Sequence, residues 1–149
     1  MSWVSPTSHD VSVWLNEERA YDDDLGTQSE LTVNGIAWSD YLILNHAALA
    51  GSTKVRFYTG MVKGFLFDKI EVDVFKDGSW VNVFAAGDAW VANAWNECVF
   101  AAGSVTKMRL RVHVNLAVPA LCSFKEVDFW EVEAPPAAVL RRLLVGVGL

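Results

Sequence analysis

The sequence contains few cysteines and few prolines. Among its 149 residues there are two cysteines and four prolines. Two cysteines do not make the disulfide framework of a small secreted domain. Both Cys98 and Cys122 lie in apolar segments with the character of strands. Buried free thiols are therefore the first interpretation, and a single disulfide between neighbouring strands is the alternative.

Features of membrane and secreted proteins are also missing. No stretch reaches the roughly 18 consecutive apolar residues that suggest a spanning helix, and no basic segment followed by an apolar run opens the chain. The sequence has no Asn-X-Ser/Thr sequon. We therefore expect no membrane span. We expect a protein that stays in the cytoplasm where it is made, or that is incorporated into a virion or other particle.

Positive charge and catalytic motifs are scarce as well. Acidic residues outnumber basic ones by 18 to 12, for a net charge of −6, which argues against binding to nucleic acid. His9, His46 and His113 are scattered and lack zinc-ligand spacing. No glycine-rich phosphate loop is present. The sequence thus predicts no catalytic centre and no enzyme.

Strand patterning, in contrast, is abundant. Residues 1–35 are polar and rich in turns, and residues 85–94 form a loop. Asp77-Gly78 lies between two strand patterns and predicts a hairpin with a type I′ turn. The segments with strand patterning are residues 36–44, 53–59, 67–76, 79–84, 96–100, 105–115 and 121–133. Strands of this number and length predict a β-sandwich or barrel over residues 1–134.

The clearest alternation, in residues 105–115, also carries a basic stripe. Lys107, Arg109 and Arg111 fall on its outward face. We expect these cations to pair across strands with Glu71 or Asp73, because opposite charges on neighbouring strands stabilise a sheet.

The last segment, residues 135–149, follows a break at Pro135-Pro136. It is apolar apart from Arg141 and Arg142. One interpretation is a terminus that packs on its own domain or frays. The other is a docking segment for a homo-oligomer or larger assembly, because exposed Val and Leu side chains are otherwise a liability.

Several of these features stand in an informative order. Ala20, Asp22 and Thr27 form an Ala-x-Asp-x-x-x-x-Thr segment that Trp38 follows. Later come the hairpin FDKIEVDVFKDGSWVNVF and the strands VTKMRLRVHVN and FKEVDFWEV. Over about residues 10–133 this resembles the galactose-binding-like superfamily, which includes discoidin domains and related carbohydrate-binding modules. The resemblance implies an all-β jelly-roll sandwich of about eight antiparallel strands.

The resemblance also implies a structural calcium site. The family uses an aspartate of an early loop, loop carbonyls, a threonine and a late glutamate, which match Asp22, Thr27 and Glu126 here. Asp24 joins them in the predicted ligand set, although Asp23 and Asp24 stand where the family has Gly and a polar residue. Calcium takes six to eight oxygen ligands, and an aspartate-rich turn supplies several. The alternative is a solvated acidic loop.

A ligand site on the loops at one end of the sandwich is the third implication. Sugar-binding members of the family use an aromatic platform with Arg, Asn or His side chains for hydroxyl groups. The candidates here are Trp90, Asn93, Trp95, His46 and Arg56. The alternative is that Trp90 and Trp95 cap the sandwich core.

Two functions follow from these features. The first is a non-catalytic module that recognises a glycan or another surface ligand. The second is a structural or assembly protein, such as a virion or tail component, that docks through residues 135–149. The isolated module, the absence of a secretion signal and the apolar tail favour the second.

Overall fold

The computed structural model describes residues 1–133, and the predicted docking segment of residues 135–149 lies outside the described residues. A short 3-10 helix, η1 (Glu17–Tyr21), precedes most of the strands. Within residues 1–133 no helix has the length and apolar character needed to cross a membrane. The strands are β1 (Ser2–Val4), β2 (Ser8–His9), β3 (Ser29–Asn34), β4 (Ala37–Trp38), β5 (Leu42–Tyr58), β6 (Phe67–Lys76), β7 (Ser79–Phe84), β8 (Trp95–Val114), β9 (Pro119–Phe124) and β10 (Glu126–Glu131).

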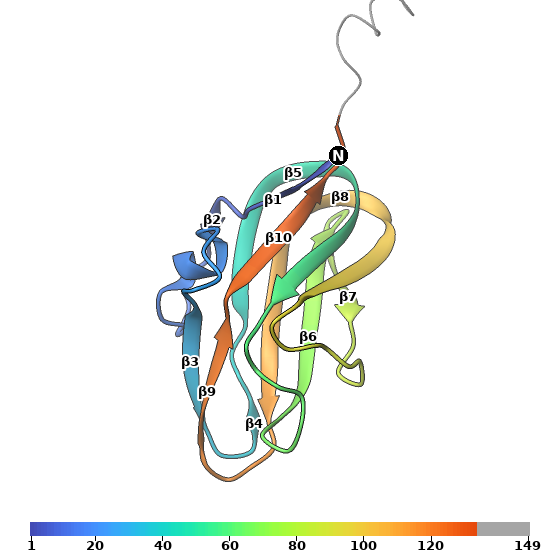
Figure 1. The fold of residues 1–149 in the computed structure, drawn as a ribbon. Coiled ribbons are helices and arrows are strands. Elements are labelled where there is room, and N and C mark those ends of the chain that lie inside the picture. Colours follow the sequence, from blue (N-terminus) through green and yellow to red (C-terminus); the bar gives the residue numbers. More distant parts are fainter. Residues whose placement is uncertain (134–149) are drawn as a thin grey trace, which may run out of the picture.

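The strands form two sheets. The larger sheet has eight strands in the order β1-β10-β5-β8-β6-β7, with β2 paired to β5 and β4 paired to β8. The smaller sheet consists of β3 and β9, which lie beside the larger sheet in Figure 1. Every strand pair is antiparallel. The predicted all-β sandwich of antiparallel strands is confirmed.

The long strands β5 and β8 connect the layers of the sandwich. They have 17 and 20 residues and pair with each other along most of their length. Figure 1 shows both strands turning over at the top of the molecule. In β5 the register shifts between Asn45 and Lys54, and Gly51 lies there with φ +69°. The prediction of separate strands on either side of each bend was wrong, because irregular pairing continues through the bends.

Further boundaries differ from the prediction, and residues 36–44 are divided between β4 and the start of β5. Residues 121–133 form part of two strands rather than one, because the chain passes from the small sheet to the large sheet at Lys125. The Lys125 N–H donates to the Tyr58 carbonyl at 2.9 Å. β3 lies within the segment predicted to be rich in turns. Its apolar residues, Leu31 and Val33, are too few for a clear alternation.

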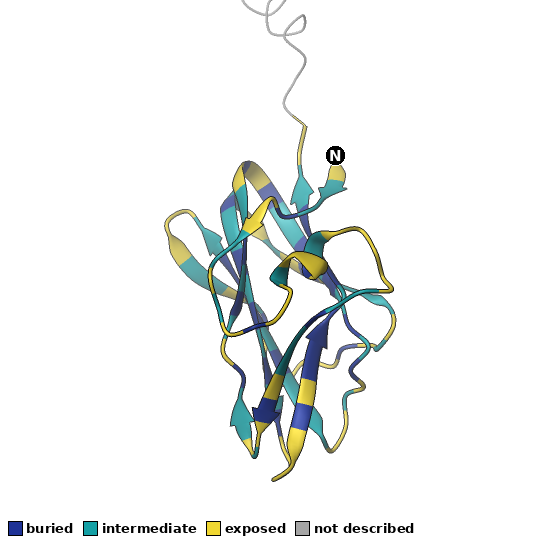
Figure 2. Cartoon of the chain, turned by 90° about the vertical axis from the view of Figure 1, so that its left-hand side faces the viewer, coloured by how far each residue is buried: buried dark blue, intermediate teal, exposed yellow. Residues whose placement is uncertain are grey.

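Aromatic side chains link the layers in the core. The ring of Phe57 on β5 lies 5.3 Å from that of Phe84 and 6.0 Å from that of Phe124 on β9. Trp14 packs on Phe124 at 5.6 Å. Each fully buried aromatic side chain of this size contributes about 1.5–3 kcal/mol. Figure 2 shows buried residues running along the strands and exposed residues concentrated in the loops.

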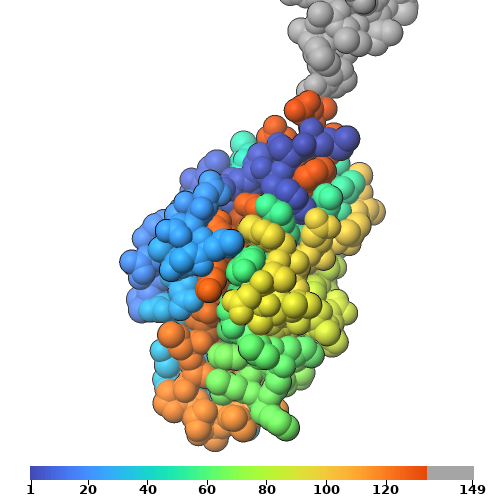
Figure 3. All heavy atoms as spheres, viewed as in Figure 1, coloured from blue at the N-terminus to red at the C-terminus, as the bar shows by residue number. Residues whose placement is uncertain are grey.

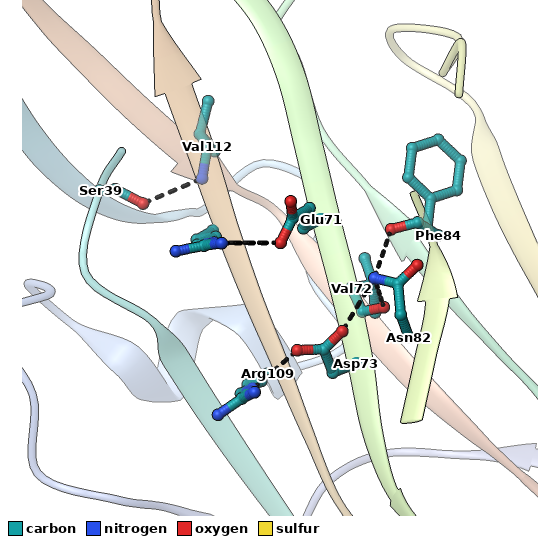
Figure 4. Close-up of polar contacts among 9 residues, drawn as sticks. Ser39, Glu71, Val72, Asp73, Asn82, Phe84, Arg109 and Val112 are labelled. Carbon is teal, nitrogen blue, oxygen red and sulfur yellow. Dashed lines mark hydrogen bonds and ion pairs between the residues drawn. The ribbon is translucent and has the colours of Figure 1, made fainter. Parts of the chain in front are cut away.

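The outward face of β8 carries the predicted ion pairs. Arg109 Nε donates to Asp73 Oδ2 at 2.8 Å, and Arg111 Nη2 donates to Glu71 Oε2 at 2.9 Å, in both cases across to β6 (Figure 4). The predicted cross-strand pairing is confirmed for Arg109 and Arg111. It was wrong for Lys107, whose Nζ lies 3.2 Å from Asp10 Oδ2 instead. The alternating inward residues are all fully buried, namely Met108, Leu110, Val112 and Val114.

The two cysteines are buried free thiols, as the first interpretation expects. Cys98 lies on β8 and Cys122 on β9. Burial raises the pKa of both thiols to about 12, and Asp88 and Glu97 add to the effect at Cys98. The thiolate form is therefore negligible at neutral pH.

The hairpin between β6 and β7 has the predicted turn. Asp77 and Gly78 both adopt positive φ, at +50° and +87°. A type I′ turn requires positive φ at both of these positions, and its twist matches that of the flanking strands.

We expect Gly78→Ala to destabilise the protein by about 1–2 kcal/mol, because a Cβ atom is disfavoured in the left-handed region. A Cβ atom at Gly78 meets nothing within 4 Å, so the cost is conformational rather than steric. Urea denaturation measures the effect. Gly87→Ala is the matched control, because Gly87 also has open space and lacks a positive φ. Equal losses in the two variants would contradict the turn assignment.

Candidate metal centre and ligand surface

Three carboxylates meet where the loop after η1 reaches the start of β10. They belong to Asp23, Glu126 and Asp128, and each offers an oxygen within 4.8 Å of the other two. Glu126 and Asp128 lie two residues apart on β10 and therefore project to the same side of the strand. Asp23 has φ +58°, and its Oδ1 accepts a hydrogen bond from Ser5 Oγ at 2.9 Å. A concentration of hard oxygen ligands of this kind suits a divalent cation.

Glu126 is the most constrained member of this acidic group. Its side chain is 2% exposed. Oε1 accepts the Asp24 N–H at 3.2 Å, but Oε2 is buried without a partner. Burial, together with the neighbouring Asp22 carboxyl group, raises the pKa of Glu126 to about 8. An ionised Glu126 thus lacks compensation for its buried charge, and either a proton or a bound cation would supply it.

The other predicted metal ligands form hydrogen bonds within the loop after η1, residues 22–27, here called the acidic loop. Thr27 Oγ1 donates to Asp22 Oδ2 at 2.6 Å, and the Asp24 N–H donates to Asp22 Oδ1 at 3.1 Å. Burial acts to raise the pKa of Asp22, but the Thr27 and Glu126 contacts lower it overall. The Gly26 N–H donates to Asp24 Oδ1 at 2.8 Å. These bonds fix the loop that brings its carboxylates to Glu126.

Glu126 belongs to both the predicted set and the observed acidic group, whereas Asp23 and Asp128 were missed. A signal for Asp128 was present, because it stands two residues after Glu126 in a strand. Nothing in the sequence distinguishes Asp23 from Asp22 and Asp24, because the direction of its side chain depends on its left-handed backbone conformation. The ligand set of Asp22, Asp24, Thr27 and Glu126 stays a prediction.

Asp128 also binds Arg56, which is part of a stacked surface. Burial raises the pKa of Asp128, and the Arg56 guanidinium partly offsets this. The guanidinium of Arg56 lies 3.7 Å from the ring centroid of Trp95 and 4.3 Å from that of Trp3. Lys54 continues the stack over Trp130 at 4.1 Å. Figure 3 shows the segments of this surface together, with the first residues in dark blue beside orange-red β10, green β5 and yellow β8.

The predicted ligand residues do not form one cluster. Trp90 is 4% exposed, and its indole N–H donates to the Met61 carbonyl at 2.8 Å. This buried position agrees with the alternative interpretation, in which Trp90 caps the core. Asn93 lies in the same loop and has φ +56°. Arg56 and Trp95 stack together on the larger sheet, whereas His46 lies elsewhere on β5 with its ring 5.8 Å from Phe129. Their roles in ligand binding stay predictions.

A prominent aromatic side chain that the sequence analysis missed lies at the opposite end from the N-terminus. Phe65, in the loop between β5 and β6, is 88% exposed. The Asn115 N–H bonds to the Leu66 carbonyl at 2.9 Å, and the Gly35 N–H to the Val118 carbonyl at 3.4 Å. The loops β3–β4, β5–β6 and β8–β9 therefore converge at the lower end in Figure 1, here called the loop end. Further exposed apolar residues in these loops are Ile36, Val62, Leu116 and Val118.

Comparison with known proteins identifies the fold. No protein-family model matches the chain, and no curated protein matches it in sequence. Among solved structures, the fucose binding module SpX-3 of Streptococcus pneumoniae aligns with a TM-score of 0.62 and 14% sequence identity, over 89% of this chain and 100% of that one.

Two further structures extend the likeness. The family 32 carbohydrate-binding module of Clostridium perfringens NanJ, in complex with galactose, aligns with a TM-score of 0.54 at 18% identity, over 87% of this chain and 91% of that one. The lectin binding domain of lectinolysin, as a histidine mutant complexed with Lewis b, aligns with a TM-score of 0.59 and 15% sequence identity. The alignment covers 85% of this chain and 92% of that one. The likeness shows the fold: the chain has the antiparallel β-sandwich of these modules, which is the jelly-roll fold that the sequence resemblance implies.

We expect the metal-free protein to lose stability as the pH rises. The pKa of Glu126 is about 8 in the folded protein against an ordinary value of 4.5, so the folded state binds more protons between these values. Its contribution to the free energy of unfolding is fully present below pH 4.5 and is lost as the pH rises through about 8. Urea unfolding in chelator measures this fall.

Glu126→Gln, which cannot ionise, is expected to reduce this decrease in the free energy of unfolding with rising pH. Glu97→Gln, at an exposed glutamate, is the control and is expected to leave it unchanged. An unaltered fall in Glu126→Gln would show that another group causes the pH dependence.

Proposed function

We propose that this protein is a non-catalytic carbohydrate-binding module that holds a structural calcium ion in the acidic group and contacts a glycan at the loop end. The observation that carries glycan binding is Phe65, an exposed aromatic ring on the loop end of a fold shared with sugar-binding modules. A ring of this kind can cover the apolar face of a sugar, and nearby polar groups can bind its hydroxyls.

Calcium binding is supported by the chemistry of the acidic group. Asp23, Glu126 and Asp128 supply carboxylate oxygens, and the buried Oε2 of Glu126 lacks a partner. Calcium would link the acidic loop to β10, which lie far apart in the sequence. The role of calcium here is structural: it would hold the loop in place. It would not contact the glycan, because Phe65 lies in a different loop.

The assembly role predicted from the sequence depends on residues 135–149. These lie outside the described residues, so docking of a homo-oligomer or virion component through this segment stays a prediction. Localisation stays a prediction as well.

We expect calcium to stabilise the protein. Calcium at 100 times its dissociation constant is expected to raise the free energy of unfolding by about 2.7 kcal/mol, because it binds only the folded state. Chemical denaturation in calcium and in chelator measures the increase. Asp23→Asn is expected to lose most of it, and the matched control Asp40→Asn, at an exposed aspartate outside the acidic group, is expected to keep it. Equal stability with calcium and chelator would contradict the site, provided that elemental analysis finds the chelated protein free of metal.

We expect Phe65→Ala to weaken glycan binding on the order of tenfold, the effect of losing about 1.4 kcal/mol. The measurement is binding to a glycan array that includes galactose, fucose and Lewis b, followed by calorimetry with the best ligand. Val99→Ala is the control, because Val99 is 71% exposed on β8, outside the loops of the loop end. A Phe65→Ala variant that binds as well as the unaltered protein would exclude this platform, and silence across the array would contradict glycan recognition.

A further inference from the structure

Arg56 is held on three sides beside the acidic group. Its guanidinium lies between the rings of Trp3 and Trp95, at 4.3 Å and 3.7 Å. On the third side, Nε and Nη2 both contact Asp128 Oδ2, at 2.9 Å and 2.7 Å. The two charged side chains are only 20% and 8% exposed. Arg56 therefore has little freedom to turn away from Asp128.

The contact pattern leaves part of Asp128 available. Both nitrogens of Arg56 bond to Oδ2, so Arg56 does not occupy Oδ1. Asp128 also belongs to the acidic group with Asp23 and Glu126. A carboxylate that is hydrogen-bonded through one oxygen is fixed in orientation, and such outer contacts commonly tune metal affinity.

We propose that Arg56, clamped between Trp3 and Trp95, is a positioning residue that holds Asp128 ready to bind the cation. This inference rests on the proposed calcium site. The four side chains come from β1, β5, β8 and β10, which are neighbours in the larger sheet. The orientation of a metal ligand therefore depends on side chains from four strands, including the N-terminal strand.

A simpler explanation is that the stack only stabilises the sheet, and the protein contains a matched arrangement that tests it. Arg109 lies 4.3 Å from the ring of Tyr41 and 4.2 Å from that of Trp80, and its Nε donates to Asp73 Oδ2 at 2.8 Å. Figure 4 shows Arg109 and Asp73 with Asn82, whose amide also donates to Asp73. Among residues 1–133, the only group of three metal-ligating side chains excludes Asp73.

The experiment compares Arg56→Lys with Arg109→Lys. Each variant keeps the positive charge but loses the planar fork and the stacking. Calcium affinity is measured by calorimetry, and the stability of each calcium-free protein is measured by urea denaturation in chelator. We expect Arg56→Lys to bind calcium about tenfold more weakly, at the low end of the effect of outer contacts on metal affinity. Arg109→Lys is expected to bind calcium normally while losing a similar amount of stability.

A second variant covers the case in which Arg56→Lys does not fold. Trp95→Leu keeps Arg56 and its ion pair but removes one face of the clamp, and we expect it to weaken calcium binding several-fold. Terbium luminescence excited through tryptophan gives an independent affinity for the unaltered protein and both arginine variants.

The outcomes separate the two proposals. Normal calcium affinity in Arg56→Lys and Trp95→Leu would overturn the positioning role while leaving the calcium site intact. Equal weakening in Arg109→Lys would also overturn it, because general loosening of the sheet would then explain the effect. Failure of the unaltered protein to bind calcium would contradict the calcium site, and this inference with it.

Discussion

The pairing of β5 with β8 is the interaction on which the rest of the structure depends. These two strands cross the bend at the top of the molecule together, so one ladder of hydrogen bonds passes from layer to layer. β10 and β2 attach to β5, whereas β6 and β4 attach to β8. The core aromatics, the acidic group and the stacked arginines are all held in position by this pair. Because the paired strands bend, parts of the same sheet lie on both sides of the sandwich core.

The acidic group illustrates how a fold concentrates like charge. Asp23 and Glu126 are separated by about a hundred residues, yet the loop after η1 and the start of β10 bring their carboxylates together. Repulsion between them is relieved by protonation of Glu126, by the ion pair of Asp128 with Arg56, or by a cation. The three differ in their requirements: Glu126 keeps its proton until the pH rises through about 8, Arg56 is always charged, and a cation must be supplied from solution.

How much could be predicted from the sequence depended on how local the signal was. The alternation in residues 105–115 and the turn at Asp77-Gly78 follow from local sequence and were predicted correctly. The alternation also led to the ion pairs of Arg109 and Arg111 with β6, whereas Lys107 pairs with Asp10 on a different segment. The bends in β5 and β8 were not, because small and polar residues there look like loops. Glu126 was found through a family resemblance. Phe65 was missed because exposure is decided by the convergence of three loops, which no local pattern reveals.

The first strand pairs with the last strand of residues 1–133, and this has a mechanical consequence. Ser2 lies opposite Glu131 in the antiparallel ladder of β1 and β10, so both strands reach the same edge of the sandwich. A force pulling these two ends apart acts on the outermost hydrogen bonds first and then on each following pair in turn. The hydrogen bonds of this ladder would break one after another. The ladder would therefore open at a lower force than strands pulled along their length, whose hydrogen bonds are loaded together. The loop end, on the opposite side of the molecule, would bear none of that load until β1 had come away.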